Sequence, residues 1–95
     1  MIRLRHMAVT VKIGQSLSDC TGGETSFVVE GKTFGELVDA IEAVHPGFRD
    51  QILTGELPLG WLLIEGGGRG AGFQLASDTV TDGTTITITM NVPGG

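Results

Sequence analysis

The segment TFGELVDAIEAVHPG, residues 33–47, predicts one amphipathic helix around which the rest of the chain is arranged. Thr33 and Glu36 match the capping box, in which the hydroxyl accepts the N3 amide and the carboxylate reaches back to the N-cap amide. Five apolar residues then follow at helical spacing and form a single stripe: Phe34, Leu37, Val38, Ile41 and Val44. His45 falls in the last turn, where it suits the helix dipole, and Pro46-Gly47 ends the helix.

Upstream of this helix, two segments predict strands that pair as a hairpin. Residues 7–13, MAVTVKI, alternate apolar and polar side chains, which is typical of a strand with one buried face. Residues 25–30 form a second β-rich run, and the small and polar residues 14–23 between the runs are interpreted as a long loop. Residues 1–6 are interpreted as an extension that precedes the first strand.

Downstream of the helix, Phe48 and Ile52 lie four residues apart and predict one more helical turn. Residues 61–65, WLLIE, form a short apolar run that predicts a strand, with Trp61 packed in the core or half-buried. The glycine-rich residues 66–72 are expected to form a flexible surface loop with Arg69 at its tip.

The C-terminal part begins with residues 73–76, which predict a short strand, and continues with the turn signal Asp82-Gly83. Residues 84–92 show the clearest alternation of the chain and predict its last strand. One face of that strand carries Ile86, Ile88, Met90 and Val92. Residues 93–95 are then a flexible C-terminal tail.

Length and composition predict one globular domain over residues 1–95. Apolar residues make up 40% of the chain and charged residues 18%, and no run approaches the roughly 18 apolar residues of a membrane helix. The element order ββαβ(β)β predicts an α+β fold, in which a mixed sheet packs on the single helix in two layers.

Charge narrows the classes of partner. Residues 14–95 hold 3 basic and 11 acidic side chains, because three of the six basic residues precede Gly14. This balance argues against nucleic acid and anionic lipid as partners. It indicates either a basic protein partner or an acidic surface that serves solubility alone. The single Cys20 offers no disulfide and no metal cluster, and the N-terminus lacks a signal-peptide pattern, so we expect no metal and a cytoplasmic protein.

Candidate catalytic groups are scattered rather than arranged as a set. His6, His45 and Cys20 form no recognisable nucleophile and base pair, so the chain is not expected to be an enzyme. Gly31-Lys32-Thr33 lacks the preceding glycine of a phosphate-binding loop, and residues 66–72 lack dinucleotide-binding spacing.

The terminal pair Gly94-Gly95 is the remaining signal. An ionised α-carboxylate can attack the α-phosphate of ATP and give an acyl-adenylate, which a sulfur or amine nucleophile then displaces. Glycines have no Cβ and can pass through a narrow channel. Residues 92–95, when extended, reach about 13–14 Å, enough to enter the active site of another protein.

Over nearly its whole length the chain resembles the MoaD/ThiS family of ubiquitin-like sulfur carriers. The resemblance is carried by TFGELVDAI at 33–41, HPGF at 45–48, the turn at 82–83, the last strand and Gly94-Gly95, in that order. It implies a β-grasp fold, with a mixed sheet of four to five strands packed on one main helix.

The resemblance also implies a function. A partner enzyme of the ubiquitin-activating type would use its own ATP to adenylate Gly95, and a sulfurtransferase or sulfide source would convert it to a thiocarboxylate. A sulfur-accepting synthase would then take the sulfur for cofactor, cysteine or specialised-metabolite biosynthesis. Gly95 would carry the activated carbonyl, while Gly94, Pro93 and Val92 would enter the partner's site, and the chain itself would bind no cofactor.

Two other functions remain open at this point. A ubiquitin-like modifier would be joined through Gly95 to lysines of other proteins by the same tail chemistry. A non-conjugating β-grasp binding module would carry its terminal glycines incidentally.

Overall fold

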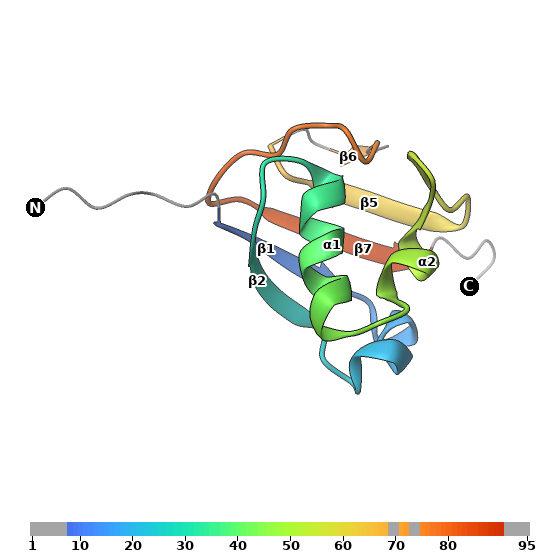
Figure 1. The fold of residues 1–95 in the computed structure, drawn as a ribbon. Coiled ribbons are helices and arrows are strands. Elements are labelled where there is room, and N and C mark those ends of the chain that lie inside the picture. Colours follow the sequence, from blue (N-terminus) through green and yellow to red (C-terminus); the bar gives the residue numbers. More distant parts are fainter. Residues whose placement is uncertain (1–7, 69–70, 73–74, 91–95) are drawn as a thin grey trace, which may run out of the picture.

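A mixed sheet with a helix across one face forms the body of the computed structural model, which describes residues 8–68, 71–72 and 75–90 (Figure 1). Within these residues the sheet has five strands in the order β2-β1-β7-β5-β6. Its strands are β1 (Ala8–Ile13), β2 (Ser26–Glu30), β5 (Leu62–Gly66), β6 (Ala71–Gly72) and β7 (Thr85–Met90). β1 and β7 are parallel, and every other pair is antiparallel, so the predicted mixed sheet and hairpin are confirmed.

The main helix, α1 (Phe34–Val44), begins where the sequence predicts. The Thr33 hydroxyl accepts a hydrogen bond from the Glu36 amide at 3.2 Å, which is the first half of the capping box. The second half differs, because the Glu36 carboxylate accepts from the amide of Lys32 at 2.7 Å rather than from Thr33. Lys32 and Phe34 both pair with the extended segment 78–80, and this path brings the Lys32 amide to the carboxylate.

The core lies between α1 and the inner face of the sheet. Four residues of the predicted helical stripe are buried, together with the alternate residues of the two central strands: Phe34, Leu37, Val38, Ile41, Val9, Val11, Ile13, Ile86 and Ile88. The prediction was wrong for Val44, whose side chain is 71% exposed. Val44 is the last residue of α1 and lies beside the edge strand β2, beyond which no other described strand covers it.

Short elements complete the described chain. The predicted extra helical turn is α2 (Phe48–Ile52), and both of its apolar residues are fully buried. A small hairpin follows, formed by β3 (Leu53–Thr54) and β4 (Leu57–Pro58). The predicted long loop after β1 contains two 3₁₀ turns, η1 (Gln15–Leu17) and η2 (Asp19–Thr21), and Leu17 and Thr21 are buried.

The turn at Asp82-Gly83 is confirmed and joins the last strand to the first. Gly83 has φ +83°, and its amide donates to the Ala8 carbonyl at 2.8 Å. The Asp82 carboxylate accepts from the Ala8 amide at 2.8 Å. Of the two long predicted strands, Met7, Asn91 and Val92 lie outside the described residues.

The prediction of a flexible loop over residues 66–72 is wrong at both ends of the segment, which belong to strands, while residues 69–70 lie outside the described residues. Gly66 ends β5 with φ +98°, and the Gly67 amide donates to the Thr85 carbonyl at 3.1 Å. A Cβ at Gly66 would overlap the carbonyl oxygen of Thr85. Glycine is therefore needed here for a close backbone approach to β7, which composition alone did not distinguish from flexibility.

Two details of this region follow. Residues 71–72 form β6, paired with β5, where the sequence predicted a loop. Of the strand predicted at 73–76, Phe73 and Gln74 lie outside the described residues, and Ala76 lies in a turn. Arg69, predicted at the tip of the loop, also lies outside the described residues. The carbonyl of Ala76 accepts a hydrogen bond from the Gly35 amide at 2.8 Å, so this turn rests on the start of α1.

The close approach at Gly66 predicts an asymmetry between two glycine substitutions. In Gly83→Ala the added Cβ meets nothing within 4 Å. The free energy of unfolding should therefore fall only by the cost of an alanine in the left-handed conformation, about 1–2 kcal/mol. Gly66→Ala has the same conformational cost, and its Cβ also overlaps the backbone of Thr85. The free energy of unfolding should therefore fall by about 1–3 kcal/mol more than in Gly83→Ala. Urea unfolding of the two variants measures the difference, and equal losses would contradict the close approach.

Candidate functional site

The predicted site residues Val92, Pro93, Gly94 and Gly95 lie outside the described residues, but the structure places the point from which they continue. That point is Met90, the last residue of β7. Five residues follow it in the sequence, and an extended chain of that length reaches at most about 18 Å. Any chemistry at Gly95 therefore takes place within about 18 Å of Met90.

An open groove of about 470 Å³ lies at this end of β7, and we call it the Trp61 groove. Segments far apart in the sequence meet there, namely η1, α2, the turn before β5 and the end of β7. It is lined by Ser16, Leu17, Asp50, Gln51, Leu59, Trp61 and Met90. Met90 has the same strand parity as the buried Ile86 and Ile88, so the groove continues the helix-side face of the sheet.

Trp61, like Val44, is more exposed than the sequence predicts. It was expected in the core or half-buried, but 53% of it is exposed. β5 begins only at Leu62, whose amide donates to the Leu59 carbonyl at 3.1 Å, so Trp61 lies on a turn at the margin of the sheet. The alternation of the strand could have signalled this, because Leu62 and Ile64 are its inward residues and Trp61 has the opposite parity.

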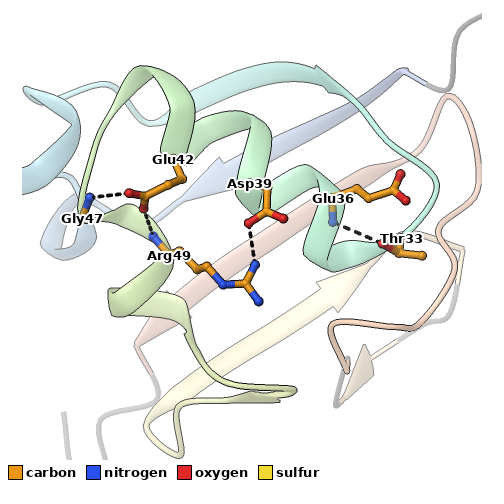
Figure 2. A network of polar contacts seen from close by, with 6 residues as sticks. All are labelled: Thr33, Glu36, Asp39, Glu42, Gly47 and Arg49. Carbon is orange, nitrogen blue, oxygen red and sulfur yellow. Dashed lines mark hydrogen bonds and ion pairs between the residues drawn. The ribbon is translucent and has the colours of Figure 1, made fainter.

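The corner between α1 and α2 positions one wall of this groove. The Glu42 carboxylate accepts from the Arg49 amide at 2.7 Å and from the Gly47 amide at 3.0 Å. The Arg49 guanidinium pairs with Asp39 at 2.5 Å (Figure 2). Figure 2 shows all these contacts on one side of α1, bridging it to the start of α2. They orient α2 so that Phe48 is buried while Asp50 remains exposed at the groove.

Among the residues that the structure describes, Glu42 and Cys20 have clearly shifted pKa values. The amide of Arg49, followed by that of Gly47, lowers the pKa of Glu42, because both donate hydrogen bonds to the charged carboxylate. Burial raises the pKa of Cys20, which favours the unreactive thiol over the thiolate. Neither group lines the Trp61 groove.

His45, which the sequence offered as a candidate catalytic residue, contacts a carboxylate and an aromatic ring. His45 is the C-cap of α1, where its Nε2 lies 2.9 Å from a Glu24 carboxylate oxygen and its ring meets Phe27 edge-on at 5.7 Å. His6 lies outside the described residues. Among the residues that are described, no group of three His, Cys, Asp or Glu side chains could hold a metal ion. No helix in that part of the chain is long and apolar enough to cross a membrane.

Solved structures match the chain over nearly all of its length. A chain in the crystal structure of the Amycolatopsis orientalis BexX/CysO complex is 32% identical, with a TM-score of 0.78, over 93% of this chain and 100% of that chain. This chain belongs to the MoaD/ThiS-type family of ubiquitin-like sulfur carriers. Mycobacterium tuberculosis CysO is 27% identical, with a TM-score of 0.71, over 88% of this chain and 99% of its own.

A third structure supports the fold of this MoaD/ThiS-type protein. Small archaeal modifier protein 1 of H. volcanii is 16% identical, with a TM-score of 0.67, over 90% of this chain and 98% of its own. No protein-family model matches the chain, and no curated protein matches it. The predicted β-grasp fold is confirmed, and the family assignment gives the protein a ubiquitin-like sulfur-carrier or modifier role.

The corner that positions α2 in this MoaD/ThiS-type protein predicts a pH dependence. The Glu42 pKa is lower in the folded state than in the unfolded one, so its stabilising contribution is complete above the unfolded value, about 4.3. That contribution is lost as the pH falls through the folded pKa. In Glu42→Gln the free energy of unfolding should therefore fall less steeply between about pH 5 and pH 2, the range in which a paired carboxylate takes up its proton.

Chemical denaturation at several pH values measures this effect. Glu36→Gln is the matched control, since Glu36 also accepts a backbone amide near an end of α1, but at the end remote from α2. An unchanged pH profile in Glu42→Gln would contradict the role of the two amides.

Proposed function

We propose that this protein is a sulfur carrier and a co-substrate rather than a catalyst. The Gly95 carboxylate oxygen attacks the α-phosphorus of ATP held by a ubiquitin-activating-type enzyme, and pyrophosphate leaves. Sulfide then attacks the carbonyl of the acyl-adenylate, AMP leaves with the bonding electron pair, and loss of the sulfur-bound proton gives the C-terminal thiocarboxylate. A sulfur-accepting synthase uses this thiocarboxylate as its donor.

One observation carries the proposal: the last described strand of a sulfur-carrier fold is followed by five residues, of which the final two are a Gly-Gly pair. Extended, those residues reach at most about 18 Å past Met90, so the tail can enter a partner's active site while the body stays outside. In this arrangement Gly95 carries the acyl group, Gly94 lines the channel beside it, and Pro93 and Val92 occupy its entrance. The protein needs no metal or cofactor of its own.

The charge of the body supports a protein partner. Residues 14–95 hold 3 basic and 11 acidic side chains, which favour a basic surface on the adenylating enzyme. The sulfur would come from a sulfurtransferase or a sulfide source. The free Cys20 is compatible with the reducing, cytoplasmic compartment that we propose for these reactions.

Intact-mass spectrometry tests the proposal. The protein is incubated with candidate adenylating enzymes, ATP and a sulfide source, and fragmentation then locates any change. We expect a mass increase equal to replacement of one oxygen by sulfur, located at Gly95. A variant lacking Gly95 should retain the melting temperature and show no mass change, because a chain terminus contributes few buried contacts.

Other outcomes would count against the carrier. No mass change with an intact Gly95 terminus across these enzymes would contradict thiocarboxylate formation. Isopeptide-linked adducts in cell extract that disappear without Gly95 would instead indicate a protein modifier.

A further inference from the structure

The Trp61 groove combines large exposed apolar side chains with an unpaired charge. Trp61 is 53% exposed and Met90 38%, and the half-buried Leu59 lines the same groove. Asp50 is exposed at the rim and forms no ion pair with another residue of the described part of the chain. An exposed tryptophan beside a carboxylate is the kind of surface from which protein interfaces take their strongest contacts.

The length of the tail connects this groove to the activation of Gly95. The five residues after Met90 span at most about 18 Å. An enzyme that holds the Gly95 carboxylate must therefore bring its own surface within that distance of Met90, whichever path the tail takes. Because Met90 itself lines the groove, the groove lies at the point from which that distance is measured.

We propose that the Trp61 groove receives an apolar side chain of the adenylating enzyme, while a basic side chain of that enzyme pairs with Asp50. This inference rests on the proposed function and names the surface by which the activating partner recognises the body of the carrier. Residues 14–95 carry an excess of eight acidic side chains, so a partner with apolar and basic groups side by side is complementary to the groove.

The other strongly exposed apolar residues lack this connection. Val28 is 74% exposed, and its strand register places it opposite Thr10, which in turn lies opposite Thr85. Thr85 is five residues before Met90, or about 17 Å along the strand, and Val28 lies two strands further across, about 10 Å. A contact at Val28 is therefore not required when the tail is held, which makes Val28 a matched control.

The experiment measures adenylation of the carrier as a function of carrier concentration, with the adenylating enzyme that produces the thiocarboxylate of the wild-type protein. Trp61→Ala should lower kcat/KM by about 10- to 100-fold, mostly through a higher KM, because removing a central aromatic contact weakens association. Trp61→Phe should recover most of the loss, and Val28→Ala should remain within about twofold of wild type. Melting temperatures verify that each variant is folded.

Two further arms separate the groove from the tail. A synthetic peptide of residues 90–95, MNVPGG, carries the tail without the groove and should react with a kcat/KM well below that of the whole protein. Asp50→Asn should reduce the salt dependence of KM, because it removes one charge from the interface.

The outcomes distinguish this inference from the proposed function. If wild-type protein and Trp61→Ala are adenylated with the same KM, the carrier function stands and the groove proposal is wrong. Equal kcat/KM for the peptide and the whole protein would also overturn the groove proposal. If no enzyme adenylates the wild-type protein, the proposed function fails and the groove proposal fails with it.

Discussion

The parallel pairing of β1 with β7 is the interaction on which the rest of the fold depends. It joins the first and last described strands at the centre of the sheet, with Val11 opposite Ile86 and Ile13 opposite Ile88. Parallel neighbours need a crossover, and the chain between them supplies β2, α1, α2 and β5. The buried side chains of the two strands form the floor on which α1 packs.

The same pairing determines where the tail begins. β7 runs beside β1 toward the end of the sheet where η1 and α2 lie, and the amide of Gly14 donates to the Ile88 carbonyl at 2.9 Å. Met90 is thereby brought to the margin of the sheet beside Trp61 and Asp50. The proposed chemistry at Gly95 and the proposed contact at the groove thus share one origin, because a single strand carries the tail and lines the groove.

The backbone interactions at the two helix starts explain how short elements maintain this arrangement. Thr33 and Glu36 bond amides at the beginning of α1, and Glu42 bonds amides at the beginning of α2 (Figure 2). α2 has only five residues and too few internal hydrogen bonds to be stable alone. Its position depends on the carboxylate of Glu42 and on the burial of Phe48 and Ile52.

The elements that could be predicted from the sequence are those whose signals are local. The cap at Thr33, the stripe from Phe34 to Ile41 and the alternation in β1 and β7 depend on neighbours a few residues apart, so they could be predicted without coordinates. The resemblance in motif order also predicted the β-grasp fold that the solved structures confirm. The tail residues 92–95 were likewise singled out from sequence, and their role stays a prediction.

Which apolar side chains are covered and which stay exposed depends on the packing of the elements against one another. Val44 and Trp61 are apolar residues of the kind usually found in a core. Val44, however, lies beside an edge strand, and Trp61 lies on a turn at the margin of the sheet. Gly66 belongs to a glycine-rich segment that is typical of a flexible loop, yet its backbone packs against Thr85. The outcomes at Val44 and Gly66 depend on segments distant in sequence, and burial is a property of the neighbours that the fold supplies rather than of the residue itself.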